Sequence, residues 1–352
     1  MPQSFEQALQ NGSLNEIGSF PKSDLHSHAG RGGNVQFISQ WLGRKIPLPP
    51  AKFSSLDDMQ NWYEENIKSM VSGVQGQVKR WEACFQQAVD DTITVLALSF
   101  SSSEIAAVGG MKEFVRILTA FHATISPNTV FLPELTYDRA CDPNEAAEEI
   151  DRILSERFFQ SLDLCCNECA QPIQRFKPLY RKAKEYGLRL KAHVGEFGSA
   201  DDVMEAVEEL ELDEVHHGIA AAKSSFVMHW LAHHNIQLNI CPSSNVMLGI
   251  VDEYKTHPIK DLYEAGVPVT VNTDDLLIFN QSVSQEYSNL YSSGVLDAQA
   301  LDTIRLTGLR QTQYHTACSA LRRPAPPGAP GRSPSSLPTI PYTKEVEPYH
   351  ES

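Results

Sequence analysis

The chain has 352 residues, of which 41% are hydrophobic and 21% charged, and it carries a formal net charge of −15. This acidic balance argues against a nucleic-acid backbone or an anionic membrane surface as the main partner, and it leaves room for a small ligand or a bound cation. The apolar stretch 92–100 is shorter than the roughly 20 residues of a membrane span, and the polar N-terminus does not resemble a signal peptide. Seven scattered cysteines then predict reduced thiols in a cytoplasmic protein.

Eight β-like runs follow one another along the chain, most of them separated by helical patterns. Apolar periodicity and turn-forming residues place these runs at 23–28, 93–100, 129–136, 158–165, 188–194, 213–218, 236–241 and 267–273. Helical patterns occupy 54–70 and 78–90 before the second run, and 143–157 and 201–210 farther along. The alternation predicts an α/β protein with a closed (β/α)8 barrel and extra helices between the first two strands. A doubly wound open sheet is the alternative, but no glycine-rich phosphate-binding fingerprint follows an early strand.

The composition changes near the C-terminus. Eight of the 31 residues from 322 to 352 are proline, and few are large aliphatics. Such a segment buries too little apolar surface to offset its loss of chain entropy, so we expect 321–352 to be a disordered tail. A polyproline ligand for a partner is the alternative. We interpret 1–20 as a lead-in segment and 21–320 as one barrel domain.

Polar residues gather at the predicted C-terminal ends of the strands, where parallel barrels carry their active sites. The first strand ends in His26 and His28, and side chains two residues apart on a strand point the same way. The fifth strand ends at His193, and Asp274 follows the eighth. Three imidazoles and a carboxylate suit zinc before other divalent cations. We therefore predict these four residues as the ligands of one zinc ion, together with a solvent molecule.

Two further polar residues are expected beside the metal without binding it. Glu196 lies three residues after His193, and His217 ends the sixth strand. A metal ion makes hydroxide available at neutral pH, His217 could take or steer its proton, and Glu196 could protonate a ring nitrogen. Asp24 is better interpreted as a hydrogen-bonding residue of the barrel core, and Asp275 could be only a helix N-cap. These residues alone predict a metal-dependent hydrolase.

Several longer stretches match one known family in order and spacing. They are PKSDLHSH (21–28), SLDLCCNE (161–168), KAHVGEFGSADDVMEAV (191–207), HHGI (216–219), CPSSN (241–245), HPIKDLYEAGVPVTVNTDDLLIF (257–279) and SVSQEY (282–287). Through these motifs the chain resembles the adenosine deaminase family of the amidohydrolase superfamily. The resemblance implies a distorted (β/α)8 barrel, one zinc ion per subunit, and a small purine substrate. The implied reaction converts adenosine or 2′-deoxyadenosine into the 6-oxo purine nucleoside and ammonia.

The resemblance also implies roles for individual residues. It makes His26, His28, His193 and Asp274 the metal ligands, and Glu196 the acid that protonates N1 of the purine. His217 would orient and deprotonate the zinc-bound water, and Asp275 would bind the purine at N7 and help to hold that water. Contacts with substrate are expected from His28, Gly30, Arg31, Cys166, Gly195 and Asp275.

Three positions depart from the family pattern. The family places an acidic residue or Asn, which helps to bind ribose, where this chain has Gly30. Cys166 stands where a glycine backbone approaches the purine ring, and His216 replaces another glycine. Arg31 could meet an anionic substituent, although a solvated loop arginine is the plainer interpretation.

These departures leave the identity of the substrate open. The alternatives are AMP or N6-methyl-AMP, adenine, methylthioadenosine or adenosylhomocysteine, and another aminated heterocycle. An inactive barrel that serves as a binding module is an alternative of another class.

Two weaker signals favour no additional site. Cys166 and Cys169 have the spacing of half a zinc motif, but a second pair is missing, so ordinary thiols are expected. His229, His233 and His234 share a helix that should lie on the outer ring of the barrel, where we interpret them as surface or packing residues.

Overall fold

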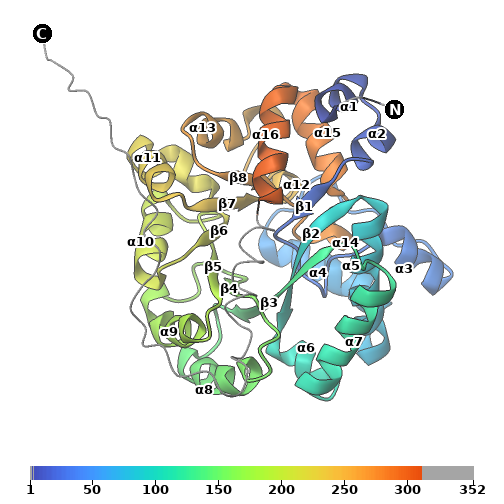
Figure 1. The fold of residues 1–352 in the computed structure, drawn as a ribbon, viewed down its shortest axis with the longest axis vertical. Coiled ribbons are helices and arrows are strands. Elements are labelled where there is room, and N and C mark those ends of the chain that lie inside the picture. Colours follow the sequence, from blue (N-terminus) through green and yellow to red (C-terminus); the bar gives the residue numbers. More distant parts are fainter. Residues whose placement is uncertain (1, 3, 311–352) are drawn as a thin grey trace, which may run out of the picture. The chain divides into compact units, whose positions relative to one another are not determined.

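Eight parallel strands, neighbours in chain order, form the centre of the structure (Figure 1). This structure is a computed structural model that describes residue 2 and residues 4–310. The strands are β1 (Lys22–Asp24), β2 (Ile93–Ser101), β3 (Val130–Asp138), β4 (Ser161–Cys165), β5 (Arg189–Val194), β6 (Glu214–His217), β7 (Gln237–Ile240) and β8 (Val269–Val271). Each strand pairs with its successor in the chain, whereas a doubly wound sheet reverses its strand order. The predicted barrel is therefore confirmed.

Helices join the strands and surround them. The described α-helices are α1 (Phe5–Asn11), α2 (Leu14–Gly18), α3 (Val35–Leu42), α4 (Leu56–Tyr63), α5 (Gly73–Asp90), α6 (Ser102–Ala107), α7 (Met111–Thr124), α8 (Pro143–Leu154), α9 (Lys177–Glu185), α10 (Ala200–Leu210), α11 (Ser225–His234), α12 (Pro242–Met247), α13 (Ile259–Glu264), α14 (Leu276–Phe279), α15 (Val283–Ser293) and α16 (Ala298–Leu309). Shorter turns are η1 (Glu64–Lys68), η2 (Ile173–Phe176), η3 (Ile219–Lys223) and η4 (Tyr254–Thr256). As predicted, extra helices (α3, α4 and α5) lie between β1 and β2.

Local sequence fixes where the helix after β5 begins. The Ser199 side chain accepts the N–H of Asp202, and the Asp202 carboxylate accepts the N–H of Ser199, which forms a capping box. The apolar residues of α10 recur at three- and four-residue spacing and turn one face of the helix to the core. Only residues 195–199 therefore separate β5 from α10, and this short loop carries Glu196.

The first strand is shorter than predicted. β1 ends at Asp24, whereas the prediction placed its end at residue 28. The next residues leave the regular ladder because they bond across to the segment after β8: the N–H of His28 donates to the oxygen of Asp274 (3.2 Å), and the N–H of Asp274 donates to the oxygen of His26 (2.9 Å). We call residues 25–28 and 272–274 the seam, since they close the barrel between its first and last strands.

Other elements differ in their ends. The helical pattern 54–70 divides into α4 and the π-turn η1, and the pattern 143–157 ends at Leu154 in α8.

In the lead-in segment, the ring of Phe5 packs edge-on against Tyr287 of α15, with 5.3 Å between ring centroids. The predicted tail 321–352 lies outside the described residues.

The barrel interior below the strand ends is charged, while the apolar core lies between strands and helices. The Lys191 ammonium lies 2.9 Å from the Glu134 carboxylate and 3.5 Å from that of Glu214. His216 fills the space beside them, with Nε2 3.2 Å from Glu134 and its ring stacked on that of His26 at 4.0 Å between centroids. The histidine that replaces the family's glycine is thus a buried part of this network.

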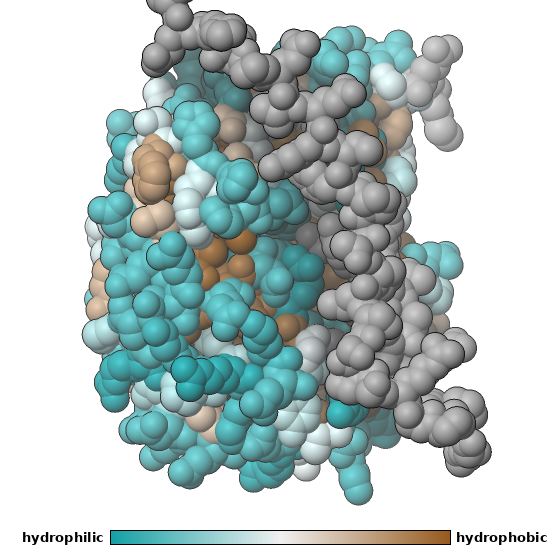
Figure 2. All heavy atoms as spheres, turned by 60° about the vertical axis from the view of Figure 1, so that its left-hand side comes forward, coloured by the Kyte–Doolittle hydropathy of each residue, from teal (hydrophilic) through white to brown (hydrophobic). Residues whose placement is uncertain are grey.

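The face of the molecule in Figure 2 is mainly hydrophilic, with hydrophobic residues in small groups. Among residues 4–310, no helix combines the length and the apolar character that a bilayer crossing needs.

Candidate active site

A cavity of about 580 Å³ opens at the carboxyl ends of the strands. Its volume falls in the range of pockets that hold small organic ligands. Every site residue predicted from the sequence lines this cavity except His26 and Gly195, which lie directly behind its wall. Residues from β1, β5, β6 and the segment after β8 therefore meet at one place, as a parallel barrel requires.

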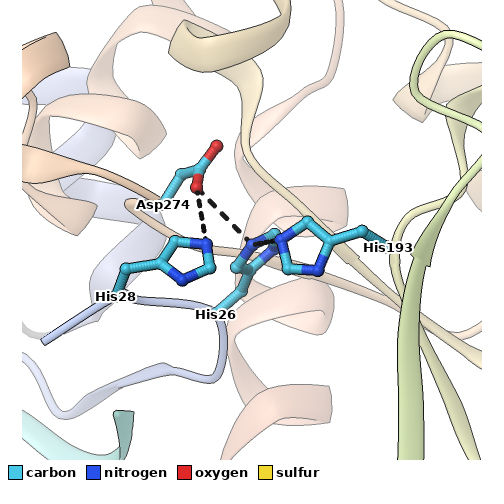
Figure 3. Close-up of side chains that lie close together, drawn as sticks. All are labelled: His26, His28, His193 and Asp274. Carbon is cyan, nitrogen blue, oxygen red and sulfur yellow. Dashed lines mark hydrogen bonds and ion pairs between the residues drawn. The ribbon is translucent and has the colours of Figure 1, made fainter. Parts of the chain in front are cut away.

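Four of the lining and underlying side chains converge on one point (Figure 3). One potential ligand atom from each of His26, His28, His193 and Asp274 lies within 4.8 Å of all the others. Nε2 of His26 is 2.9 Å from Nε2 of His193, and Oδ1 of Asp274 is 3.4 Å from Nε2 of His28. Nε2 of His26 also lies 3.6 Å from the same oxygen of Asp274. Imidazole nitrogens this close to one another and to a carboxylate oxygen form an arrangement that a shared cation would stabilise.

The other nitrogen of each ring is held from behind. The partners are Asp163 Oδ1 for His193 Nδ1 (3.0 Å), Ser99 Oγ for His28 Nδ1 (2.8 Å) and the main-chain oxygen of Asn239 for His26 Nδ1 (3.2 Å). A hydrogen bond donated by Nδ1 fixes the tautomer and leaves the Nε2 lone pair free. At His28 the Ser99 hydroxyl can accept such a bond, because it donates its own proton to the main-chain oxygen of Ser27 at 3.5 Å. All three Nε2 atoms are therefore available to the same ion, and the buried N₃O donor set fits zinc.

Three residues at the cavity adopt a left-handed backbone conformation that non-glycine residues rarely take. The φ angles are +71° at Cys166, +63° at His217 and +59° at Asp274. Such conformations cost on the order of 1–3 kcal/mol each, and they persist only where the surroundings impose them. At Asp274 the imposing contacts are the main-chain bonds of the seam.

Two carboxylates in the cavity have an oxygen without a protein partner. Glu196 Oε1 and Asp275 Oδ1 are buried and have no hydrogen bond to any described residue. Burial, together with the negative charges of Asp274 and Glu168, raises the pKa of Glu196 well above its usual value, which favours the protonated form of this side chain. Both orphaned atoms lie where a ligand in the cavity could satisfy them.

Asp275 does not act as a helix cap. It precedes α14, but its side chain makes no capping hydrogen bond. Its Oδ2 instead accepts a hydrogen bond from Nη1 of Arg31 at 3.3 Å. Arg31 also donates to Gln60 at 2.6 Å and lies over the ring of Tyr63. It is therefore part of the cavity wall rather than a solvated loop arginine.

A chain of hydrogen bonds determines which nitrogen of His217 accepts. The main-chain N–H of Ile259 can only donate, so His257 Nδ1, 3.1 Å away, accepts. Burial lowers the pKa of His257 to about 3, so the neutral ring carries its proton on Nε2 and donates it to Asn245 Oδ1 at 3.3 Å. The Asn245 amide then donates to His217 Nδ1 at 3.3 Å. The His217 proton consequently resides on Nε2, which lies 3.7 Å from Glu196 and 3.8 Å from Asp274.

Asn245 and His257 were not among the site residues predicted from the sequence. Asn245 lies in the motif CPSSN and His257 in HPIKD. The sequence does not show that both residues act on His217. His257 lies two residues before the start of α13 at Ile259. Asp24 is not a ligand and accepts a 2.6 Å hydrogen bond from the Thr273 hydroxyl, as a core residue would.

The part of the cavity wall that Glu104, Ser101 and Ser103 form is polar. Glu104 lines it, and a Cβ atom at Gly30 would lie only 2.8 Å from Glu104 Oε1. The other oxygen of Glu104 accepts the N–H of Ser101 at 2.9 Å, so the carboxylate is held in place. The Glu104 carboxylate of α6 thus occupies the space beside Gly30. At that position the family has an acidic residue or Asn, and this chain has none.

Most of the weaker sequence signals lie outside the cavity. His229, His233 and His234 are exposed on α11, as predicted, and Cys169 is exposed and does not line the cavity. Cys166 does line it, with its sulfur 3.4 Å from that of Cys165.

Comparison with known proteins identifies relatives over most of the chain. The family model for adenosine deaminase matches residues 21–317. A putative adenosine/adenine deaminase from Treponema pallidum is 32% identical over 297 residues, which cover 83% of this chain and 99% of the relative. An adenine deaminase structure from Arthrobacter aurescens aligns with a TM-score of 0.73 at 22% identity, over 86% of this chain and 96% of that one. A zinc-bound amidohydrolase structure from Burkholderia ambifaria aligns with a TM-score of 0.68 at 17% identity, over 91% and 93% of the two chains.

Proposed function

The chain belongs to the adenosine deaminase family and is a hydrolytic enzyme of that family, and from this premise we propose that it converts a 6-aminopurine nucleoside, adenosine or 2′-deoxyadenosine, into the 6-oxo purine nucleoside and ammonia. The observation that carries the proposal is the pair of unsatisfied carboxylate oxygens, on Glu196 and Asp275, that share a cavity with the His/Asp cluster. A purine offers ring nitrogens to both carboxyl groups while its C6 faces the cluster.

We propose that His26, His28 and His193 hold one zinc ion through Nε2, with a carboxylate oxygen of Asp274 as the fourth protein ligand. Zinc, when bound, supplies a water of lowered pKa, so that hydroxide is available at neutral pH. Asp163 and Ser99 support the ligands by fixing two of the rings.

Glu196 is proposed as the general acid. Because its pKa is raised by burial, it carries a proton that it can donate to N1 of the purine. Protonation at N1 draws electrons from C6, so water adds at C6 and the amino group leaves as ammonia. The atoms balance as nucleoside plus water giving 6-oxo nucleoside plus ammonia.

His217 is proposed to orient the attacking water. The sequence left open whether this residue takes or steers a proton. Its Nδ1 already accepts from Asn245, so the resting ring presents an N–H at Nε2 to the cavity. A proton on Nε2 favours the role of orienting the water over that of taking its proton. The N–H donates a hydrogen bond to the water oxygen, and a lone pair of that oxygen is then directed toward C6.

Asp275 is proposed to bind N7. Since N7 is itself an acceptor, this contact requires a proton on the carboxyl group, and burial does raise the pKa of Asp275. Arg31 occupies Oδ2, which leaves Oδ1 to carry that proton toward the purine.

The polar side of the cavity supports a nucleoside over a free base. Glu104, Ser101 and Ser103 line it within the same cavity as the metal cluster. Carboxylate and hydroxyl oxygens have further lone pairs that can accept hydrogen bonds from sugar hydroxyls, and free adenine has no sugar to donate them. Adenine is the second candidate, because the Treponema relative is described as acting on adenosine or adenine. The free thiols of the six described cysteines fit the proposed cytoplasmic location.

The proposal is tested by ammonia release from purified protein of known metal content. The panel is adenosine, 2′-deoxyadenosine, AMP, adenine, methylthioadenosine and a pterin. We expect the highest kcat/KM for one of the two nucleosides and about one zinc per chain. A higher kcat/KM for adenine or AMP would replace the nucleoside assignment, and turnover of none would overturn the deaminase proposal.

A further inference from the structure

Glu168 binds the loop that carries Glu196. It follows β4 and is only 5% exposed. Its Oε2 accepts the main-chain N–H of Gly195 at 2.5 Å. Its Oε1 accepts the N–H groups of Phe197 and of Gly198, the latter at 2.5 Å. One carboxylate thus satisfies three main-chain donors, which is enough to compensate for the burial of its charge.

These three donors lie on both sides of Glu196. One oxygen of Glu168 binds the residue before it, and the other binds the two residues after it. The main-chain segment that carries the Glu196 side chain is therefore fixed at both ends by the same rigid group. A shift of this segment in either direction would break at least one charged hydrogen bond.

Contacts with neighbouring elements also restrain the loop. Gly195 has φ +73°, and a Cβ there would lie 2.3 Å from a methyl group of Val203. Its carbonyl oxygen accepts the N–H of Ala220 at 2.9 Å. The loop thus rests on neighbouring elements on one side and on Glu168 on the other.

Glu168 does not touch the cavity. It is absent from the lining residues, whereas Glu196 is among them. A general acid must lie within hydrogen-bond reach of the atom that it protonates, and a misplacement of about 1 Å can cost roughly 10²-fold in rate. We propose that Glu168 is a positioning residue that holds Glu196 at the purine nitrogen, an inference that rests on the proposed function.

The decisive experiment is a double-mutant cycle with Glu168→Gln and Glu196→Gln. An amide keeps one acceptor oxygen and turns the other into a donor, so Glu168→Gln releases one end of the loop with little change in volume. If Glu168 acts through Glu196, it has nothing to position once Glu196 is replaced. The double variant should then be no slower than Glu196→Gln alone.

We expect Glu168→Gln to lower kcat by roughly 10–10²-fold with unchanged zinc content. Asp91→Asn is the matched control. Asp91 is a buried carboxylate that also accepts a main-chain N–H, from Ser284 at 3.1 Å, but it precedes β2 at the opposite end of the barrel. This control should lower stability without a selective loss of kcat. Should Glu168→Gln fail to fold, Glu168→Asp keeps the charge but shortens the reach, and it should also lose kcat with zinc retained.

Three outcomes would overturn the inference: multiplicative losses in the double variant, a loss that follows zinc content, or full activity of both Glu168 variants. Failure of the underlying function is recognised separately. If Glu196→Gln alone keeps full turnover, Glu196 is not the acid, whatever the Glu168 variants do.

Discussion

Asp163 Oδ1 lies 3.0 Å from Nδ1 of His193, and the carboxylate is completely buried. This contact orients the ring and increases the basicity of Nε2, the atom proposed to bind zinc. Replacing a partner of this kind typically costs 10–100-fold in metal affinity. We expect Asp163→Asn to lower zinc affinity by roughly that factor, measured by competition with a chromogenic chelator. Asp138→Asn, on the exposed rim of the cavity, should leave affinity unchanged. Equal affinity in Asp163→Asn and the unmodified protein would contradict the proposed support.

Adjacent carboxylates allow a matched test of metal binding. Asp274 joins the three histidines, whereas Asp275 points to Arg31. Asp274→Ala should lower the zinc content of purified protein. Asp275→Ala should retain zinc and lose turnover, because it removes the contact proposed for N7 and the bond to Arg31 but no proposed zinc ligand. Elemental analysis of both proteins decides the point, and full zinc occupancy in Asp274→Ala would refute its assignment as a ligand.

The Asn245 amide donates a hydrogen bond to His217, and a carboxylate at this position would accept one instead. A carboxylate accepts but does not donate, so Asn245→Asp should move the His217 proton to Nδ1 and turn Nε2 toward the cavity as an acceptor. We expect kcat to fall by roughly 10–10²-fold with zinc retained. The ¹⁵N shifts of the histidine side chains report the tautomer directly. Asn289→Asp, on α15 outside the cavity, is the control. An unchanged tautomer, or an unchanged kcat despite a changed one, would remove this role from Asn245.

His257 makes the fold sensitive to acid. Its folded-state pKa is about 3 because it is buried, against an ordinary value of 6.5. Between these values the unfolded chain binds more protons than the folded one, so the free energy of unfolding decreases as the pH falls through this window. One group contributes at most about 1.4 kcal/mol per pH unit. Urea denaturation from pH 7 to 4 should show a shallower decrease for His257→Gln than for the unmodified protein. Parallel slopes would show that His257 is not responsible.

The sequence predicted the barrel and the cluster well, because both rest on local signals. Strand periodicity marks each strand, and the alternation in His26-x-His28 places two rings on one side. The shortening of β1 was not predictable, since it depends on main-chain bonds to Asp274 at the other end of the domain. Periodicity within one segment carries no information about such a partner.

Residues that act through others were missed for a similar reason. For Arg31 a solvated loop position was the plainer interpretation, but it donates a hydrogen bond to Asp275, a partner that becomes visible only when the barrel closes. Glu168 stood within a quoted motif without a role, because its bonds go to main-chain N–H groups of another loop. Main-chain donors leave no trace in residue identity, so a sequence pattern cannot indicate them.

The seam has a consequence for how the protein matures. Its two halves, residues 25–28 and 272–274, come from opposite ends of the barrel sequence and are joined by main-chain hydrogen bonds. A nascent or truncated chain that ends before β8 therefore lacks Asp274 and has no complete donor set. The complete set of proposed zinc ligands therefore exists only in a chain whose first and last strands have come together.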